Sequence, residues 1–224
     1  VRDAAGVLLP TPRVARRARV IAQMEECDSV LYGAAAPLGL LAPALPVERQ
    51  VALTHGHEAW WASIPGPRET LRRIGDTVDT VTYLGSYTRH RLSRALSAGA
   101  VHRMRRLSPG VDTARFRPGV GGDEVRAHYR LGERPVVVCV SRLVARKGQD
   151  TLLRAWPRVL ADVPDAALLV VGDGPDARRL RSAARGLDSV LFSGPVSAQR
   201  LPAFYDAGDV FAMLCRDRWF GLEQ

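Results

Sequence analysis

Residues 136–150 read VVVCVSRLVARKGQD, and this stretch decides the fold of the second half of the chain. The first five residues are apolar and have the length and composition of a buried strand. A loop with Arg142, Lys147 and Gly148 follows, and then a helical pattern. α/β proteins bind anionic groups where a strand passes through such a loop into a helix. The stretch therefore predicts a parallel-sheet domain with an anion site at this loop.

Lys147 is the one lysine of the chain, and the other 31 of its 32 basic residues are arginines. A compact, strongly hydrated ammonium differs from a planar guanidinium. A lysine in this loop therefore indicates a functional role in which arginine cannot replace it. The alternative is that Lys147 is simply a solvated loop residue and that its being a lysine has no functional meaning.

The second half of the chain alternates between strand and helix patterns. Because the strands are separated by helices, the alternation predicts a mainly parallel sheet. The predicted strands are 136–140, 167–171, 190–192 and 210–213, and the predicted helices are 149–159, 176–184 and 201–207.

Four loops follow these predicted strands. In a parallel sheet they emerge at one edge, where α/β proteins bind their ligands. They are residues 141–148, 172–175, 194–197 and 214–221. Neither a Walker loop nor the G-x-G-x-x-G dinucleotide fingerprint is present in them. Gly172 and Gly174 are expected to let the backbone approach a ligand, and the alternative is an ordinary strand-to-helix turn.

The first half predicts a second α/β domain. Its expected helices are 13–24, 34–45, 68–78 and 89–98, and its expected strands are 29–32, 50–54 and 79–84. Residues 107–112 are rich in turn formers and 116–122 have the composition of a linker. We therefore expect two Rossmann-like domains, residues 1–118 and 119–224.

Composition restricts the class of protein. The chain has 224 residues, of which 46% are hydrophobic and 25% charged, as in ordinary globular proteins. No apolar run approaches the roughly 20 residues that span a bilayer. Cys27, Cys139 and Cys215 lie far apart, which predicts buried free thiols in a reducing cytoplasm. The chain starts without Met or a signal peptide, and we expect it to lie within a longer protein.

The net charge of +9 is concentrated in the first half. Residues 1–118 hold 17 arginines against 10 acidic residues, a balance of +7, and residues 119–224 hold 15 basic against 13 acidic residues, a balance of +2. This excess indicates an anionic partner such as phospholipid headgroups or nucleic acid, unless it reflects only an arginine-rich proteome. The candidate patches are Arg13, Arg16, Arg17 and Arg19, and Arg89, Arg91, Arg94, Arg103, Arg105 and Arg106.

Five motifs occur in order along the chain. They are SPGVD-x-x-x-F at 108–116, SRL-x-x-RKG at 141–148, VVGDGP at 170–175, F-x-G-x-V at 192–196 and A-x-DVFAM at 207–213. Together they resemble the retaining family-4 glycosyltransferases of the GT-B fold, in which two Rossmann-like domains face a cleft. Residues 32–38, 54–58 and 142–150 are similar to the actinobacterial phosphatidylinositol mannosyltransferases of the PimB type, which use GDP-mannose. The resemblance covers residues 20–224.

The resemblance implies a donor site in the second domain. Arg142 and Lys147 would hold the diphosphate of the nucleotide sugar and offset the charge of the leaving group, which is worth several kcal/mol in a dry cleft. No metal or other cofactor is then needed, and the chain has no D-x-D motif between its halves. The further donor-site residues that the resemblance implies are Ser141, Gly172, Gly174 and Val196, the last through its backbone to the base.

The resemblance also implies residues in the first domain. His55 would lie in the cleft near the transferred sugar and the acceptor, and act in catalysis with Arg142 and Lys147. His57 and Glu58 would lie beside it. From the residues alone, His55 could equally cap a strand or fill the core, and His57 and Glu58 could simply open the next segment.

Two departures from the family pattern stand out. Relatives begin with a strand and a Gly-rich loop that lie before the first residue of this chain, and carry an E-x7-E motif beyond its last. Glu223 does not match that motif in register, and Trp219-Phe220-Gly221 is unusual. We therefore expect an internal fragment with both domains truncated, inactive by itself.

The resemblance thus implies a retaining enzyme that moves a mannosyl group from GDP-mannose to a phosphatidylinositol mannoside-type glycolipid. We expect it in the cytoplasm, with peripheral contact at the inner face of the plasma membrane. The alternatives are a related enzyme with another nucleotide sugar or acceptor, and a non-catalytic nucleotide-sugar-binding module. A nucleic-acid partner is disfavoured, because the chain lacks aromatic–basic interleaving and nucleic-acid motifs.

Overall fold

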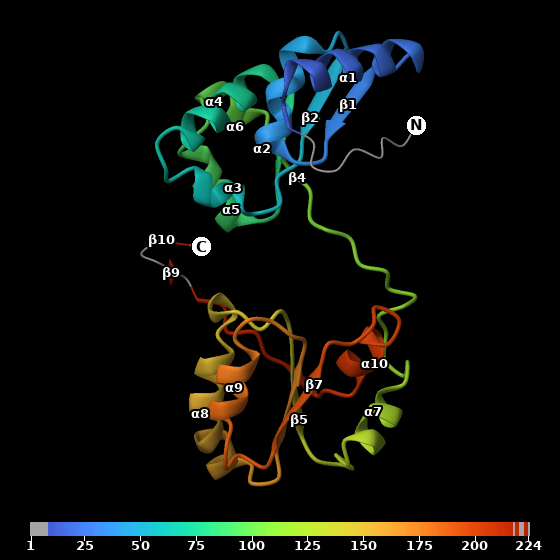
Figure 1. The fold of residues 1–224 in the computed structure, drawn as a ribbon, viewed down its shortest axis with the longest axis vertical. Coiled ribbons are helices and arrows are strands. Elements are labelled where there is room, and N and C mark those ends of the chain that lie inside the picture. The colour runs from blue at the N-terminus through green and yellow to red at the C-terminus, as the bar shows by residue number, and fades with distance from the viewer. Residues whose placement is uncertain (1–8, 217, 220–221, 224) are drawn as a thin grey trace. The chain divides into compact units, whose positions relative to one another are not determined.

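The chain folds into two compact units, residues Val1–Gly110 and Val111–Gln224. The computed structural model describes residues 9–216, 218–219 and 222–223. Each unit is built on a four-stranded parallel sheet with helices packed on it (Figure 1). The α/β prediction is therefore confirmed for both halves.

The boundary between the units follows Gly110, whereas the sequence pattern placed it after Pro118. Phe116 explains the difference, since its ring packs edge-on against Tyr205 with centroids 5.9 Å apart. Arg115 also hydrogen-bonds to the Ala198 carbonyl. The proline- and glycine-containing stretch is therefore partly an ordered element of the second unit.

The sheet of the second unit has the strand order β7-β6-β5-β8, and all its neighbouring strands are parallel. β6 is buried on both faces, which explains its continuous apolar sequence. Leu168 and Val170 pack with one set of helices, while Leu169 and Val171 pack with the other. The strands are β5 (Val136–Val140), β6 (Ala167–Val171), β7 (Val190–Gly194) and β8 (Val210–Phe211).

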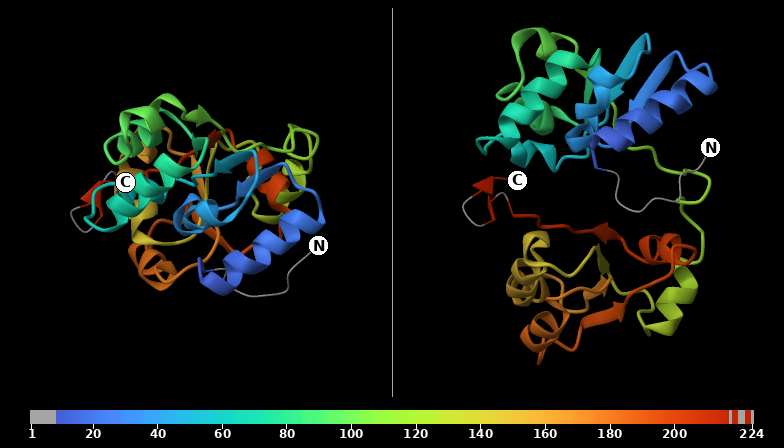
Figure 2. Two further views of the ribbon diagram at one scale, coloured as in Figure 1. Left: turned by 90° about the horizontal axis from the view of Figure 1, so that it is seen from above. Right: turned by 45° about the horizontal axis from the view of Figure 1, so that its top comes forward.

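Helices cover both faces of this sheet. α8 and α9 lie on one face and α7 and α10 on the other (Figures 1 and 2). Trp156 of α8 is fully buried, and its indole Nε1 donates to Ser189 Oγ at 2.9 Å. A buried side chain of this kind stabilises the fold by roughly 1.5–3 kcal/mol. The elements are α7 (Gly122–His128), η2 (Ala145–Lys147), α8 (Gln149–Asp162), α9 (Ala177–Ala183) and α10 (Leu201–Asp206), with a short antiparallel pair β9 (Arg218–Trp219) and β10 (Leu222–Glu223).

The first unit has the strand order β1-β2-β3-β4, again parallel throughout. Its core includes Tyr32, Leu71, Ile74 and Leu92. The strands are β1 (Ser29–Tyr32), β2 (Arg49–Ala52), β3 (Thr80–Tyr83) and β4 (Arg105–Arg106). The helices are α1 (Pro12–Met24), α2 (Ala35–Leu38), η1 (Gly39–Ala44), α3 (Glu58–Trp61), α4 (Pro67–Thr77), α5 (Ser86–Ser93) and α6 (Ala98–His102).

Local sequence signals account for several element ends. α1 begins after Thr11, whose hydroxyl accepts from Val14 N, and has Pro12 in its first turn. The expected helix 34–45 is instead a short α2 followed by the 3-10 helix η1, which contains Pro43 and so lacks one backbone donor. The short elements α3, α6, β4 and α7 were not expected from the sequence.

α7 shows why residues 116–122 are not simply a linker. The Asp206 carboxylate of α10 accepts three backbone N–H groups, from Gly119 at 2.8 Å, Val120 at 2.9 Å and Gly122 at 2.7 Å. A Cβ on Gly122 would lie 2.7 Å from the Asp206 backbone, so glycine is required where α7 meets α10. Burial raises the pKa of Asp206, but these N–H donors outweigh it and hold the pKa below its ordinary value.

Asp206→Asn should lower the free energy of unfolding by about 2 kcal/mol at pH 7, because an amide oxygen replaces a charged acceptor. The carboxylate has a lower pKa folded than unfolded, so its stabilisation is fully present above about pH 4 and is lost as pH falls through the folded pKa. Urea unfolding at pH 7, 5, 4 and 3 measures this difference. Asp188→Asn, at an exposed residue of the same unit, is the control. A constant difference from pH 7 to pH 3 would contradict the assignment.

The cysteine prediction holds for one residue of three. All three thiols are free, and Cys139 is buried, which raises its thiol pKa. Cys27 and Cys215 are exposed, because they lie in the loops after α1 and β8 rather than in the sheet. Within the part of the chain that the structure describes, no helix is long and apolar enough to cross a membrane.

Candidate functional site

Loops of the second unit gather at the carboxyl edge of its parallel sheet, as the sequence predicts. Those after β5, β6 and β7 line a pocket of about 190 Å³. Parallel sheets bind ligands at this edge, because helix N-termini and loop backbones face it. The lining residues are Val140, Ser141, Arg142, Val171, Gly172, Asp173, Pro195, Val196 and Leu201.

Arg142 and Lys147 both belong to the loop after β5, and neither forms an ion pair with a carboxylate among the described residues. Arg142 is exposed. Lys147 is half-buried, and its Nζ lies 3.7 Å from Met213 Sδ, a weak acceptor. Two cations without a carboxylate partner at the edge of a sheet suit a diphosphate.

Gly172 and Gly174 both lie close to the backbone of the loop after β5. A Cβ on Gly172 would lie 2.1 Å from the Ser141 carbonyl oxygen, and one on Gly174 would lie 2.4 Å from that of Leu143. The loop after β6 therefore needs glycines to pack against the loop after β5. Their freedom is used within the protein, and Gly172 also lines the pocket.

The loop after β8 packs against the Lys147 turn. Gly148 adopts φ +71°, and a Cβ there would lie 1.7 Å from the Leu214 carbonyl oxygen. Arg216 N donates to the Arg146 carbonyl at 3.0 Å. The predicted fourth loop thus reaches the site by supporting Lys147 and Gly148. Phe220 and Gly221 of that expected loop lie outside the described residues.

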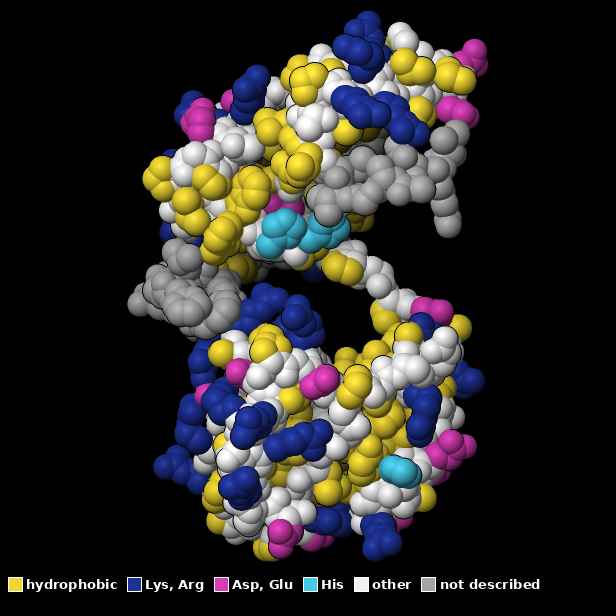
Figure 3. Space-filling model, viewed as in Figure 1, with side chains coloured by type: hydrophobic (Ala, Val, Ile, Leu, Met, Phe, Trp, Pro, Cys, Tyr) yellow, Lys and Arg dark blue, Asp and Glu magenta, His cyan; other side chains and the backbone are white. Residues whose placement is uncertain are grey.

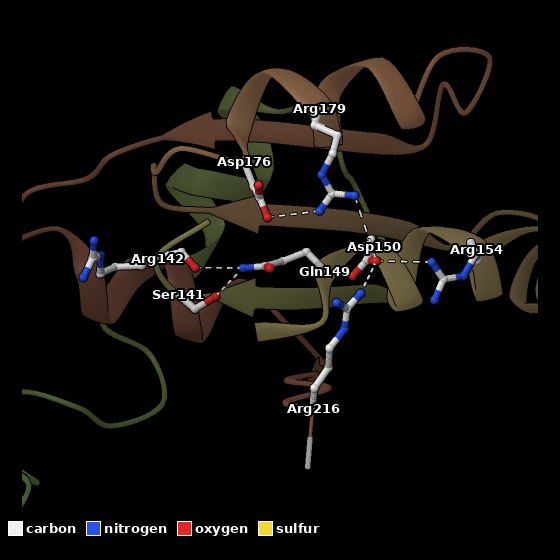
Figure 4. A network of polar contacts seen from close by, with 8 residues as sticks. All are labelled: Ser141, Arg142, Gln149, Asp150, Arg154, Asp176, Arg179 and Arg216. Carbon is white, nitrogen blue, oxygen red and sulfur yellow. Dashed lines mark hydrogen bonds and ion pairs between the residues drawn. The ribbon is translucent and has the colours of Figure 1, made fainter. Parts of the chain in front are cut away.

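Asp150, in the first turn of α8, joins three guanidinium groups (Figure 4). Its Oδ2 accepts from Arg154 at 3.2 Å and from Arg216, and lies 4.0 Å from Arg179. Burial raises the pKa of this carboxyl, but Arg216 and Arg154 outweigh that effect and the pKa lies below its ordinary value. The network connects α8, α9 and the segment after β8 directly behind the Lys147 turn.

Asp150 and its neighbour Gln149 were not among the predicted site residues, although both are buried and polar. A signal was present, since two polar residues begin a predicted helix immediately after Gly148. Their function depends on partners in other loops, which the sequence pattern does not reveal.

Val196 lies in the loop after β7, at the pocket wall beside Pro195. Its side chain is half-buried and packs on the core that α7 and α10 form with the sheet. Its role toward the base of a nucleotide, which the resemblance implies, stays a prediction.

His55, His57 and Glu58 lie together in the first unit, in the segment after β2. His55 is exposed, and its Nε2 lies 2.5 Å from the Gly33 carbonyl oxygen. The rings of His55 and His57 are stacked with centroids 6.4 Å apart. Thr54 anchors the segment, because its hydroxyl donates to the Thr82 carbonyl at 2.8 Å.

Glu58 is fully buried, so it supports the two histidines rather than presenting a surface to a ligand. Its Oε2 accepts from His55 N at 2.9 Å, and its Oε1 lies 3.4 Å from His57 Nε2. Glu58 also opens α3, as the alternative interpretation of this residue predicted. We find no cluster of three or more His, Cys, Asp or Glu with metal-binding geometry among the described residues.

A larger pocket of about 680 Å³ also lies in the second unit, between residues 111–118 and α10. It is lined mainly by apolar side chains, with Arg117 and Asp206 as its charged members. Asp206 is already committed to backbone N–H groups. The smaller pocket at the sheet edge is therefore the stronger candidate for an anionic ligand.

Comparison with known proteins gives a consistent result for the second unit and for the whole chain. Residues 134–223 match the family model described as Glycosyl transferases group 1. The chain is 47% identical over its full length to a GDP-mannose-dependent alpha-(1-6)-phosphatidylinositol monomannoside mannosyltransferase of Mycobacterium tuberculosis. It is 40% identical to a GDP-mannose-dependent monoacylated alpha-(1-6)-phosphatidylinositol monomannoside mannosyltransferase of Corynebacterium glutamicum. It spans 59% and 60% of these two relatives.

Solved structures share the fold. Anabaena HepE in complex with UDP aligns with a TM-score of 0.70 and 20% identity, over 89% of this chain and 56% of that one. Sucrose-phosphate synthase from Thermosynechococcus elongatus aligns with a TM-score of 0.64 and 20% identity, over 89% and 53%. The prediction of a GT-B-type α/β fold with two Rossmann-like units is confirmed.

Proposed function

Since residues 134–223 carry a glycosyl transferases group 1 domain, we propose that the protein transfers a mannosyl group from GDP-mannose to a phosphatidylinositol mannoside-type glycolipid. The observation that carries the proposal is the pair of cations, Arg142 and Lys147, at the carboxyl edge of the sheet. The printed names of the relatives support the choice of donor and acceptor.

The donor diphosphate binds at Arg142 and Lys147 in this proposal, and the nucleoside extends toward Val196. When the bond between the sugar C1 and the phosphate oxygen breaks, its electron pair leaves with GDP. The two cations stabilise that negative charge, and one such preorganised contact is worth about 3–4 kcal/mol. This chemistry requires no metal or other cofactor. Ser141 and Gly172 complete the wall of the site.

The reaction retains configuration at the sugar C1. The mannosyl group of GDP-mannose is alpha-linked, and the relatives are named for alpha-(1-6) products. The acceptor hydroxyl forms the new C1–O bond on the face that GDP leaves, and its proton passes to the phosphate oxygen of the departing GDP. His55 and His57, in the first unit, are the groups that we assign to the sugar and acceptor.

The full-length protein with GDP-mannose and a phosphatidylinositol monomannoside acceptor should release GDP and form a mannosylated lipid. Excess EDTA should leave the rate unchanged, because the cations of the protein replace a metal. Coupled detection of GDP and mass spectrometry of the lipid measure both. Turnover with UDP- or ADP-sugars alone would reassign the donor. A folded protein that binds GDP-mannose but transfers no sugar would establish a non-catalytic binding module instead.

We infer further that the protein contacts anionic membrane at the cytoplasmic face, where a lipid acceptor is reached. Arg13, Arg16 and Arg19 are exposed on α1, while its apolar side packs on the core. The second predicted patch is weaker than its sequence suggested. Arg91 is buried against Ser63, and Arg103 donates to the backbone carbonyls of Gly75 and Val78 at the end of α4, so their charges serve the fold.

Replacing Arg13, Arg16 and Arg19 by Ala should weaken binding to anionic liposomes by roughly 3 kcal/mol at most, at about 1 kcal/mol per well-placed basic residue. The binding should weaken with salt and be absent for neutral liposomes. Basic side chains gather over α1 and also over α8 and α9 (Figure 3). The matched control therefore removes three exposed arginines near α9, Arg178, Arg181 and Arg185. Equal loss in the two variants would contradict a specific role for α1 in co-sedimentation.

A further inference from the structure

Gln149 is a buried amide placed behind the arginine of the donor site. It is 3% exposed, and both of its Nε2 hydrogens are used (Figure 4). One is donated to Ser141 Oγ at 2.8 Å and the other to the Arg142 carbonyl at 2.9 Å. An amide from the first turn of α8 thereby connects the helix to the loop after β5.

We propose that Gln149 is a positioning residue that holds Arg142 in place for the donor diphosphate, an inference that rests on the proposed function. Gln149 does not reach the ligand in this role. It fixes the backbone from which an exposed guanidinium extends, and such support from behind a site restricts the geometries of the contacting group.

The residues on either side of Arg142 are hydrogen-bonded through their backbone to the segment that ends β6. The Gln149 amide adds a contact at Arg142 itself. Ser141 N donates to the Val171 carbonyl at 3.1 Å, and Leu143 N donates to the Asp173 carbonyl at 2.9 Å. These two bonds join the residues before and after Arg142 to the end of β6. Among the described residues, the Arg142 carbonyl accepts from Val144 N, at 3.0 Å, and from the Gln149 amide.

The side chain of Arg142 has no ion-pair or hydrogen-bond partner among the described residues. Its direction therefore depends on its backbone until a ligand binds. Loss of the amide should leave the guanidinium chemically intact but require the ligand to order the loop, and that ordering costs affinity.

A double-mutant cycle on GDP affinity tests the inference in the full-length protein by isothermal titration calorimetry. Arg142→Ala should raise the GDP Kd roughly tenfold to a hundredfold, as expected for loss of a charged hydrogen bond. Gln149→Met, which keeps the volume but removes both donors, should raise it roughly three- to tenfold. The double variant should bind no more weakly than Arg142→Ala, because Gln149 acts through Arg142.

The matched control is Gln50→Met in the first unit. Gln50 is a half-buried amide whose Nε2, like that of Gln149, donates to a backbone carbonyl, here that of Ala42 at 3.3 Å. Its replacement should lower the unfolding temperature without changing the GDP Kd. If Gln149→Met does not fold, Gln149→Leu also removes both donors without adding a charge, and should show the same coupling.

The outcomes distinguish a failure of the proposed function from a failure of the role given to Gln149. If the wild-type protein does not bind GDP, or if Arg142→Ala binds it like the wild type, the proposed function is overturned and this inference with it. If Arg142→Ala binds weakly but Gln149→Met binds like the wild type, only the inference is overturned. The same holds if the two substitutions are additive, because a purely structural effect does not depend on Arg142.

Discussion

Lys147→Ala should lower the rate of mannosyl transfer by roughly 10²–10³-fold, since removal of one preorganised electrostatic contact to a developing negative charge has that effect. In the proposed reaction the ammonium stabilises charge that appears on GDP only as the C1–O bond breaks, so kcat should fall more than KM rises. Lys147 contacts a thioether rather than a carboxylate. Its removal should therefore change the free energy of unfolding by no more than about 0.5 kcal/mol.

The control is Arg146→Ala. Arg146 is the adjacent basic residue and is exposed, and its backbone carbonyl, which accepts from Arg216 N, is kept in the variant. Its transfer rate should stay close to that of the wild type. Lys147→Arg should recover only part of the lost rate, because a planar guanidinium does not replace a compact ammonium. Undiminished transfer by Lys147→Ala would refute the role given to this lysine.

Gly148→Ala should destabilise the protein by about 3 kcal/mol or more and abolish transfer. An L side chain at φ +71° costs roughly 1–2 kcal/mol. The new methyl would also lie 1.7 Å from the Leu214 carbonyl oxygen, so the segment after β8 or the Lys147 turn must move. That movement displaces the lysine from the diphosphate, and the substitution thus acts on stability and activity together.

Gly186→Ala separates the cost of backbone strain from the cost of the collision with the Leu214 carbonyl. Gly186 has φ +82°, but nothing lies within 4 Å of a Cβ at that position. It should lose only the roughly 1–2 kcal/mol of backbone strain, and transfer should be unaffected. Urea unfolding of both variants measures the difference. Equal losses of stability would show that the collision at Leu214 is relieved at no cost.

Much of the fold follows from the sequence because both faces of the second sheet are covered. A strand buried on two faces must be apolar throughout, so β5 and β6 are visible as runs without any knowledge of their neighbours. α7 was not predicted, because it does not stand out as an apolar pattern of its own. It is short, its first residue is Gly122, and its start is held by the distant carboxylate of Asp206, so its acidic first turn and basic last turn are the only helix signals in its own sequence.

Some residues of the candidate site could likewise be predicted from the sequence, and others could not. Arg142 and Lys147 could be predicted, because a basic loop directly after a strand must emerge at the sheet edge. The supporting roles of Gln149 and Glu58 could not. Gln149 is buried with its partners in the preceding loop, and Glu58 is buried beside His55 and His57 of its own segment, so in each case the burial and the contacts exist only in the folded chain.

The arginines of the first unit show most clearly which properties cannot be predicted from the sequence. The sequence alone determined that the first half is basic, and composition cannot distinguish an exposed arginine from one that binds backbone carbonyls. Only the tertiary structure decided that Arg91 and Arg103 serve the fold while the arginines of α1 face solvent. The order of the longer strands and helices, in contrast, could be predicted from the sequence, because hydrophobic periodicity is a local property. The tertiary structure decided which glycines and amides hold the loop of Lys147 in place, because contacts between loops depend on distances that only the folded chain sets.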